Sequence, residues 1–385
     1  MRKIKVMCVF GTRPEAIKMA PLVKELKRRE EIDCTLCVTA QHREMLDQVL
    51  HAFDLIPDHD LNIMKQGQSL ADVTTRALLG LQEVMRQERV DIVLVHGDTT
   101  TTFAGALAAF YEQIAVGHVE AGLRTWHKYS PYPEEMNRQM VGVLADLHFA
   151  PTKQSAQNLL REGKRPETVV ITGNTAIDAM ATTIKKDYTH PQLEWAKGSR
   201  MILLTAHRRE NLGEPMRQIF QGIKRIIEEF DDVKVLYPIH KNPLVREIAN
   251  EVFAGMERVR LIEPLEVLDF HNFQNQATLI LTDSGGIQEE APSLGKPVLV
   301  LRDTTERPEG IAAGTLKLVG TEEETIYQET KKLLCDAQAY AAMHHASNPY
   351  GDGHASERIA DAIISWFDDR LKTEEPCETL KQEKK

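Results

Sequence analysis

Three acidic side chains follow predicted strands in the first 140 residues of this 385-residue chain. Asp98 follows the expected strand Asp91–His96, and Glu120 ends the strand Ala115–Glu120. Glu134 stands in the loop beyond. Because parallel strands end at one edge of a sheet, where ligands bind, we expect these carboxyls to converge. Crowded carboxyls shift one another's pKa, which suits them to general acid–base chemistry.

Each acid also has a structural interpretation, which the sequence leaves open. Asp98 would serve equally as a cap for the helix expected over the threonines that follow it. Glu134 would complement the dipole of a helix as an acid in its first turn.

The second half of the chain places cations and glycines after its strands. His207 and Arg208 follow Met201–Ala206, and Ser284-Gly285-Gly286 follows Thr278–Asp283 at the start of an expected helix. Arg307 follows a further strand. Exposed backbone N–H groups at a glycine-rich helix start bind phosphate, so the set predicts a diphosphate site. Solvated loop charges, or a salt-bridge network between domains, are the alternatives.

Arg13 is the corresponding cation in the first half. It lies between Gly11, which permits a tight turn, and Pro14, which suits the start of a helix. An anion is favoured at a helix amino terminus. The same residues also describe a well-capped helix with a surface arginine.

These side chains are positioned by strands that alternate with amphipathic helices, including Leu70–Glu88 and Glu214–Phe230. Most strands are continuous apolar runs, which indicates burial on both faces of a parallel sheet. The pattern predicts doubly wound α/β architecture. The expected strands are Ile4–Phe10, Asp33–Thr39, Asp91–His96, Ala115–Glu120, Asp146–Ala150, Thr168–Thr172, Met201–Ala206, Val233–His240, Arg258–Ile262, Thr278–Asp283, Pro297–Arg302 and Thr315–Val319.

A dozen strands exceed one comfortable open sheet, so we expect two domains. The predicted boundaries are 1–172 for a domain that carries the carboxylates and 173–354 for a domain that binds the anion. Residues 355–372 are expected to form a last helix. The polar tail 373–385 is expected to be disordered.

Composition excludes several classes of function. Lys+Arg 47 against Asp+Glu 57 gives a net charge of −10, so the chain has no general attraction for nucleic acid or anionic membrane. Five cysteines in a chain of this length do not suggest a disulfide scaffold, and reduced thiols favour the cytoplasm. No metal-binding motif occurs, so we expect no metal. We expect His118 in the core, and His271 at the surface or in packing.

Six segments, in order along nearly the whole chain, resemble the non-hydrolysing UDP-N-acetylglucosamine 2-epimerases of bacteria, most closely the Gram-positive branch. They are Phe10–Pro21, His96–Thr101, His118–Arg124, Pro133–Arg138, Thr205–Asn211 and Thr282–Pro292.

The resemblance implies a GT-B fold, in which two Rossmann-like domains hold UDP in the cleft between them. It also implies that the last helix, residues 355–372, returns to the first domain. It implies reversible conversion of UDP-GlcNAc to UDP-ManNAc through elimination of UDP, a glycal intermediate and re-addition, for cell-envelope polysaccharide synthesis. It implies no cofactor, and it implies a homodimer.

The resemblance also assigns roles to residues. Asp98, Glu120, Glu134 and His207 would be catalytic, although which carboxylate takes the proton stays open. Phe270 would lie against uracil, and Glu290 would hold ribose. The full binding set is Arg13, Lys18, Arg138, Arg208, Phe270, Ser284, Gly285, Gly286, Glu290 and Arg307.

Family members of this type are activated by substrate at a second, adjacent site. The matching positions are Gln41, His42, Glu134, Arg208 and His240. Glu44 stands where glutamine is expected, and Gly67 stands where arginine is expected. An added acid and a lost cation would both weaken the binding of a diphosphate there.

Three other functions fit the same residues. A retaining GT-B glycosyltransferase would bind the same nucleotide sugar and transfer it to an acceptor. A hydrolysing epimerase would release UDP and free ManNAc. A catalytically silent UDP-sugar binder is the third, but it would have no use for acids near a diphosphate.

Overall fold

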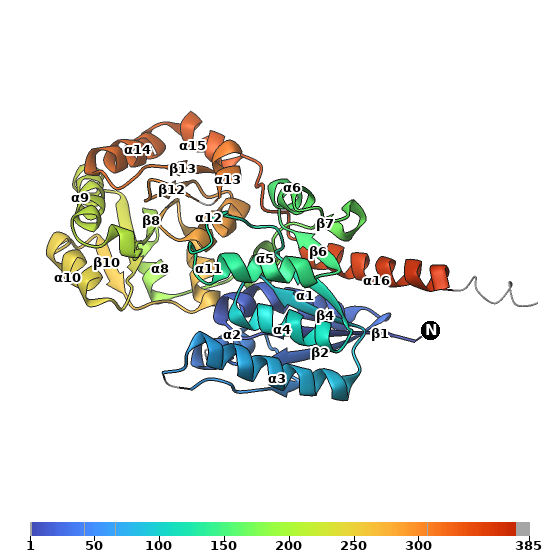
Figure 1. The fold of residues 1–385 in the computed structure, drawn as a ribbon. Coiled ribbons are helices and arrows are strands. Elements are labelled where there is room, and N and C mark those ends of the chain that lie inside the picture. Colours follow the sequence, from blue (N-terminus) through green and yellow to red (C-terminus); the bar gives the residue numbers. More distant parts are fainter. Residues whose placement is uncertain (1, 42, 66, 306, 375–385) are drawn as a thin grey trace, which may run out of the picture. The chain divides into compact units, whose positions relative to one another are not determined.

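The computed structural model describes residues 2–41, 43–65, 67–305 and 307–374, which form two compact units (Figure 1). The first unit contains Met1–Ala179 and Gly353–Lys385, and the second contains Met180–Asp352. The chain therefore divides after Ala179, downstream of the boundary expected at 172. Asp178 ties this stretch to the first unit, because its carboxylate accepts from the backbone N–H groups of Ala355 and Ser356.

The first unit is built on a parallel seven-stranded sheet with the order β3-β2-β1-β4-β5-β6-β7. Its strands are β1 (Ile4–Phe10), β2 (Ile32–Val38), β3 (His59–Asp60), β4 (Ile92–His96), β5 (Ala115–Val119), β6 (Leu147–Ala150) and β7 (Val169–Ile171). Its helices are α1 (Arg13–Arg28), α2 (Arg43–Ala52), α3 (Leu70–Glu88), α4 (Thr100–Tyr111), α5 (Glu134–Leu144), α6 (Lys153–Arg161), α7 (Thr175–Thr183), which runs into the second unit, and α16 (Ala355–Glu374).

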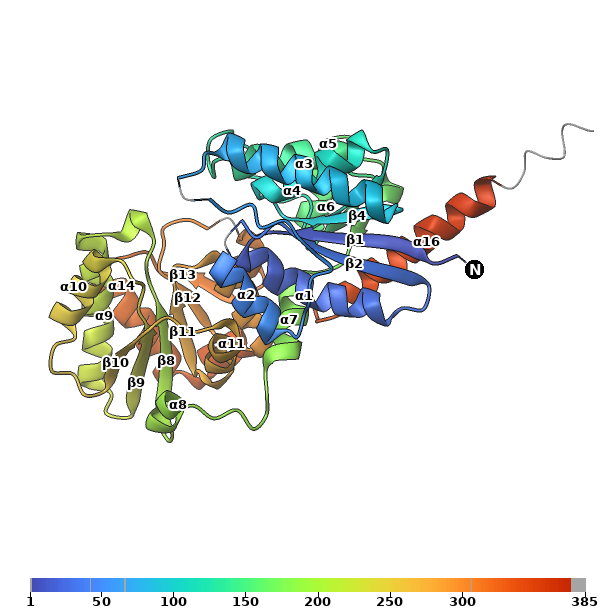
Figure 2. The ribbon, with the colours of Figure 1, turned by 90° about the horizontal axis from the view of Figure 1, so that it is seen from below.

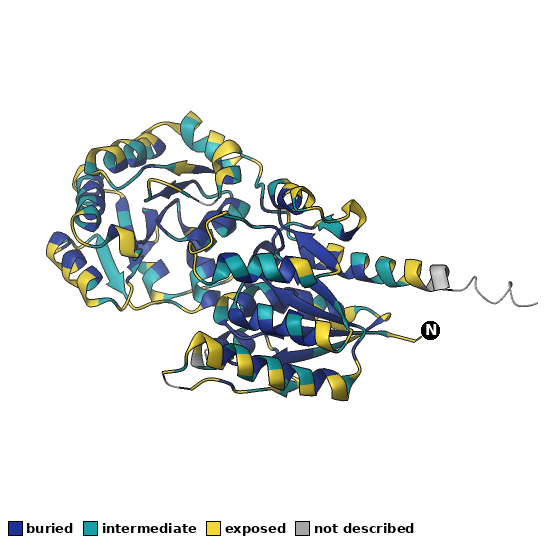
Figure 3. Ribbon diagram, viewed as in Figure 1, coloured by how far each residue is buried: buried dark blue, intermediate teal, exposed yellow. Residues whose placement is uncertain are grey.

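Helices cover both faces of this sheet. Helices α3, α4 and α5 lie over one face, and α1 and α2 lie over the other (Figure 2). Met7 and Val9 pack towards α3 and α4, while Val6 and Cys8, which alternate with them along β1, are equally buried. The central strand β4 is accordingly buried along its length, whereas the helices expose residues on their outer faces (Figure 3). Continuous apolar strands are the sequence signature of this arrangement.

The second unit repeats the design with a parallel six-stranded sheet in the order β10-β9-β8-β11-β12-β13. Its strands are β8 (Arg200–Thr205), β9 (Val233–Pro238), β10 (Val259–Ile262), β11 (Leu279–Thr282), β12 (Val298–Val300) and β13 (Leu316–Leu318). Its helices are α8 (Pro191–Ala196), α9 (Glu214–Glu229), α10 (Pro243–Val252), α11 (Val267–Gln276), α12 (Gly285–Glu290), α13 (Pro308–Ala312), α14 (Glu323–Cys335) and α15 (Ala337–His344).

The predicted fold class, two Rossmann-like doubly wound parallel sheets as in the GT-B fold, is confirmed. The twelve expected strands are all present, within one or two residues at their ends. The strand β3 was missed, because two residues at a sheet edge carry no periodic signal. Of the tail expected at 373–385, residues 375–385 lie outside the described residues. Within the part of the chain described, no helix is long and apolar enough to cross a membrane.

Candidate active site

The acidic residues lie at the switch point of the first sheet. The strand order reverses between β1 and β4, which are neighbours but not consecutive. Arg13 stands just beyond β1, Asp98 just beyond β4, and Glu120 just beyond the next strand, β5. Open α/β sheets bind their ligands outside the carboxyl ends of the strands at such a point.

Asp98 is held by an arginine from helix α5. The Arg138 guanidinium donates to Oδ2 of Asp98, and its Nη1 lies 3.5 Å from Oε2 of Glu135. Glu135 is fully buried and also accepts the backbone N–H groups of Thr125 and Trp126, at 3.0 and 3.1 Å. Arg138, predicted to bind substrate, is therefore fixed between two carboxylates and bears on the acid itself.

The environment of Asp98 changes its acidity. Burial raises the pKa of Asp98 to about 6, against the opposing effect of Arg138, and the carboxylates of Glu120 and Glu134 raise it further. The three acids predicted to converge therefore interact electrostatically. A carboxyl with a pKa near 6 exchanges its proton close to neutral pH, as a general acid or base must.

Glu120 occupies a different environment. Its φ of +61° lies in the left-handed region, which is unusual outside glycine and recurs at functional sites. Its Oε2 is paired with the Lys18 ammonium of α1, accepts from Nδ2 of Asn174 at 3.0 Å and lies 3.7 Å from Nε2 of His96. Lys18, predicted to support the site, is thus paired with one of the acids predicted to be catalytic.

Arg13 is the first residue of α1, and its side chain is half-buried. Below it, Glu15 accepts the backbone N–H groups of Gly11 and Thr12 at 3.0 and 2.8 Å. The other Glu15 oxygen accepts from the Thr99 hydroxyl at 2.6 Å. The interpretation of a well-capped helix is therefore correct, and the capping carboxylate also fixes the Arg13 loop to the segment that carries Asp98.

The structure tests the helix-cap interpretation of Asp98 and the helix-dipole interpretation of Glu134. Thr99, not Asp98, caps α4, since its hydroxyl oxygen accepts from the N–H of Thr102 at 3.1 Å. The helix-cap interpretation of Asp98 is therefore wrong. Glu134 is the first residue of α5, so the dipole interpretation applies to it alongside its effect on Asp98.

The basic residues lie at the switch point of the second sheet, between β8 and β11. His207 and Arg208 follow β8, and their backbone N–H groups donate to Oδ2 of Asp283, at the end of β11, at 2.7 and 2.8 Å. The His240 ring stacks on the His207 ring, with centroids 5.1 Å apart and planes 11° apart.

The protonation of His207 depends on these neighbours. Burial lowers its pKa below the ordinary value, and the His240 ring and the Arg208 guanidinium lower it further, whereas Asp283 opposes them. The ring is therefore less ready to carry a proton when no anion is present. A bound diphosphate would reverse this balance.

The paired glycines open α12, with Ser284 at its N-cap. Gly285 allows a close approach, because a Cβ there would stand 2.6 Å from Nη1 of Arg307. Arg307 donates through Nε to the buried Glu289 at 2.8 Å. Arg307 thus lies beside the glycines as predicted, with a carboxylate as partner.

Helix α11 bears on Glu290. The buried Gln274 donates to its Oε2 at 2.9 Å, and Nε2 of His271 lies 3.8 Å from the same oxygen. Phe270, on this helix, is half-buried against the core. Of the two interpretations of His271, packing is correct, since it is 2% exposed. His118 is confirmed in the core, with Nε2 2.7 Å from the Gly97 carbonyl oxygen.

The candidate second-site residues are only partly described. Oε1 of Gln41 accepts from the Thr101 hydroxyl at 3.2 Å. His42, and the side chain of Glu44, lie outside the described residues. Gly67 has a φ of +72°, a backbone conformation that an arginine would adopt only with strain.

Three acids that hold the candidate site residues in place were missed from the sequence: Glu15, Glu135 and Asp283. Glu135 adjoins Glu134 in one helical turn, and no pattern in the sequence distinguishes the buried acid from its neighbour. For Glu15 a signal existed, since Thr-x-x-Glu before an apolar run is a capping box. Asp283 was counted as the last residue of a strand.

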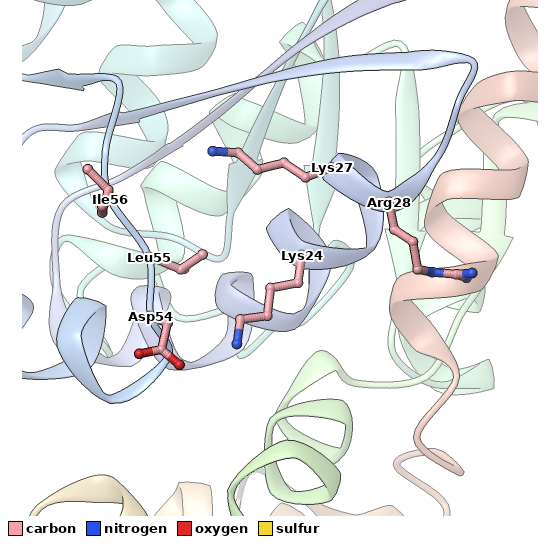
Figure 4. Close-up of a pocket in the computed structure, with 6 residues that line it drawn as sticks. All are labelled: Lys24, Lys27, Arg28, Asp54, Leu55 and Ile56. Atoms are coloured by element: carbon pink, nitrogen blue, oxygen red, sulfur yellow. The ribbon is translucent and has the colours of Figure 1, made fainter.

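A surface hollow of about 510 Å³ on the first unit contains none of these residues (Figure 4). It is lined by Lys24, Lys27, Arg28, Asp54, Leu55 and Ile56. Lys27 lies 3.6 Å from Asp58, and Arg28 lies 2.8 Å from Glu25. These side chains form a solvated, ion-paired face. Among the residues described, no group of three or more His, Cys, Asp or Glu side chains is placed to hold a metal ion.

Comparison with known proteins places this chain in a family. Residues 24–364 match the sequence profile described as UDP-N-acetylglucosamine 2-epimerase. The UDP-N-acetylglucosamine 2-epimerase of Bacillus subtilis (strain 168) is 66% identical over 364 residues, which cover 94% of this chain and 96% of the relative.

Solved structures agree with the sequence match. A UDP-N-acetylglucosamine 2-epimerase crystal structure is 63% identical, with a TM-score of 0.90 over 96% of this chain and 98% of that one. The Neisseria meningitidis UDP-GlcNAc 2-epimerase, bound to UDP-GlcNAc, is 49% identical, with a TM-score of 0.84 over 94% and 100%. This chain is a member of the UDP-N-acetylglucosamine 2-epimerase family.

Proposed function

We propose that the protein interconverts UDP-GlcNAc and UDP-ManNAc without hydrolysis, for cell-envelope polysaccharide synthesis. The proposal rests on the different side chains that stand at the switch points of the two sheets. One gathers Asp98, Glu120 and Glu134, with the pKa of Asp98 raised to about 6. The other gathers His207 and Arg208 beside the helix start at Gly285.

The reaction explains why both sets are needed. The proton on C2 of the sugar is not adjacent to a carbonyl, so its removal alone would leave an unstabilised carbanion. If the C1–O bond to UDP breaks as the C2–H bond breaks, the electron pair forms a C1=C2 bond and UDP leaves with its charge. Delivery of a proton to the other face of C2, and return of the UDP oxygen to C1, complete the epimerisation.

The acids of the first unit handle the sugar in this proposal. Asp98 is suited to exchange a proton near neutral pH, and Glu120 is paired with the Lys18 ammonium. Arg138 bonds to Asp98 and so favours its ionised form. Glu134 adds the third carboxyl.

The second unit holds the UDP moiety in this proposal, and Arg13 is a further cation for the diphosphate. The N–H groups at Ser284, Gly285 and Gly286 bind phosphate oxygens, and His207 and Arg208 stabilise the charge that develops on departure. Phe270 lies against uracil. Glu290 accepts from ribose hydroxyls, with its Oε2 already held by Gln274.

Proton NMR of the protein with UDP-GlcNAc in deuterated water tests this function. We expect UDP-ManNAc to appear with deuterium at C2, because the proton taken from C2 exchanges before its replacement arrives. Free ManNAc and UDP would indicate the hydrolysing reaction. An unchanged substrate would contradict the proposal and favour a glycosyltransferase or a silent binder.

We also propose a homodimer, formed through the outer face of α3, α4 and α5. These helices lie side by side (Figures 1 and 2) and expose Leu79, Phe110, Tyr111 and Val143. Val143→Glu should then yield a monomer in analytical ultracentrifugation, because the carboxylate would be buried unpaired. Leu244→Glu, on α10 in the other unit, is the matched control. A Val143→Glu dimer as stable as the control would contradict this interface.

The cytoplasm is the proposed location, supported by free thiols at each cysteine in the described part of the chain. Activation by a second UDP-GlcNAc molecule, through Gln41, His42, Glu134, Arg208 and His240, completes the proposal. Such activation makes the initial-rate curve sigmoidal in UDP-GlcNAc. A strictly hyperbolic curve would contradict it.

A further inference from the structure

A buried carboxylate supports the segment that carries His207. Asp283 has no exposed surface, and its Oδ2 accepts two backbone N–H groups, from His207 and Arg208. The same oxygen accepts from Nδ2 of Asn211 at 3.3 Å. One carboxylate oxygen thus fixes the loop beyond β8 to the end of β11.

The other oxygen is used differently. Oδ1 of Asp283 has no hydrogen-bond partner among the residues described, although it is buried. It lies 3.7 Å from Nδ1 of His207. A movement of about 1 Å would bring the two atoms to hydrogen-bond distance. A buried carboxylate oxygen without a donor is costly, so this arrangement favours a proton on the facing ring nitrogen.

The charges around His207 are otherwise positive or neutral. The His240 ring stacks on it from the end of β9, and Arg208 follows it in the chain. Tyr237 on β9 faces Asp283, and its hydroxyl donates to the Ala206 carbonyl oxygen at 2.5 Å. Among these described neighbours, Asp283 is the group that stabilises the protonated ring.

We propose that Asp283 is a positioning residue for His207, which it orients through Nδ1 and holds ready to become protonated. With Nδ1 occupied by Asp283, Nε2 is left to donate to the departing diphosphate. This role rests on the proposed function, in which His207 stabilises the UDP leaving group. The ring then takes a proton as the anion develops, and Asp283 stabilises the charge.

The test compares Asp283→Asn with Asn211→Ala. An asparagine keeps an oxygen for the two backbone N–H groups but removes the charge. Asn211→Ala removes a donor from the same carboxylate and keeps the charge. The pKa of His207 is measured by NMR titration of labelled histidines, with the signal assigned from a His207→Gln spectrum. The pH profile of kcat is recorded for each variant.

We expect Asp283→Asn to lower the pKa of His207 by about one unit or more, as loss of an opposite charge does. The alkaline limb of its kcat profile should move to lower pH by a similar amount, and Asn211→Ala should cause a much smaller shift. An unchanged pKa in Asp283→Asn, or equal shifts in both variants, would overturn the proposal. The titration needs no substrate, so it tests the effect of Asp283 on His207 separately from the reaction. A wild-type protein that leaves UDP-GlcNAc unchanged would contradict the proposed function but not this effect.

Discussion

The chemistry at the first switch point comes from unequal surroundings of similar side chains. Asp98 is held by Arg138 but loses most of its water, and burial outweighs the arginine. Glu120 is paired with the Lys18 ammonium in the ion pair that fixes its oxygen. One acid is therefore mainly desolvated and the other mainly ion-paired, and such unequal surroundings are the usual basis for distinct roles of two acids in one site.

The raised pKa of Asp98 makes a prediction about stability. Because the folded pKa lies above the unfolded value of 3.8, the ionised carboxyl opposes folding, and stability falls as pH rises from about 4 through 6. Asp98→Asn should therefore raise the melting temperature at pH 7.5 more than at pH 4.5. Thermal unfolding at both pH values, with Asp91→Asn as the partly exposed control, measures this. An equal change in melting temperature at both pH values would mean that the pKa of Asp98 is not raised.

Substitution of the candidate catalytic residues should lower activity without unfolding the protein. Asp98→Asn and His207→Ala should each lower turnover by roughly 10²-fold or more while the fold persists, since acid–base and charge-stabilising groups contribute on this scale. Circular dichroism and the NMR assay measure the two properties. The exposed His354 provides the control substitution His354→Ala, which should retain activity. Rates like those of the wild type in both site variants would mean that the site is elsewhere.

The sequence could not show which side chain pairs with each candidate site residue. The types Asp, Glu, His and Arg at strand ends were sufficient to select Asp98, Glu120 and His207. The partner of each depended on distances of a few ångströms between strands far apart in sequence. Glu135 and Asp283 were therefore overlooked, although both are fully buried.

At the scale of elements, prediction succeeded where burial is two-sided. The strand β4 is buried at all five positions, so its sequence is a continuous apolar run. The edge strand β3 has neither length nor pattern. Helix α7 begins in the first unit and runs past Ala179, so the composition near 172 gave the boundary only approximately.

The loop between β1 and α1 depends on one glycine. A Cβ at Gly11 would stand 2.0 Å from the Thr39 hydroxyl and 2.7 Å from that of Thr101, so Gly11→Ala must displace the loop that carries Arg13. We expect it to lower the free energy of unfolding by about 1–3 kcal/mol, the usual cost of overpacking, and to lower turnover as well.

Gly142→Ala is the matched control, measured by the same denaturant titration. Gly142 lies inside α5, where an added Cβ would meet only the terminal Nη2 of Arg124, at 3.3 Å, so a shift of a few tenths of an ångström accommodates it. Alanine is favoured over glycine in a helix by about 1 kcal/mol, so stability should rise or stay the same. A Gly11→Ala protein as stable as this control would show that the loop adapts freely.

For the whole molecule, the central fact is that a chain of net charge −10 concentrates cations where one of its sheets reverses strand order. The two sheets share this strand order but differ in the side chains at that point: Asp98 and Glu120 stand at the first, and His207 and Arg208 stand at the second. A fold class alone therefore does not specify a function, whereas the side chains at its switch points do.

This division predicts how UDP alone should act on the protein, followed by hydrogen–deuterium exchange. UDP lacks the sugar, so the strongest protection should fall on Ala206–Asn211 and Ser284–Glu290, with little change around Asp98 and Glu120. At a concentration 100-fold above its Kd, UDP should also stabilise the fold by about 2.7 kcal/mol, because it binds only the folded chain. Adding UDP-GlcNAc should extend protection to the acidic loops, since only then is there a sugar to contact. Protection by UDP confined to the acidic loops would mean that the first unit, not the second, binds the nucleotide. The raised pKa of Asp98 would then have no role at the sugar.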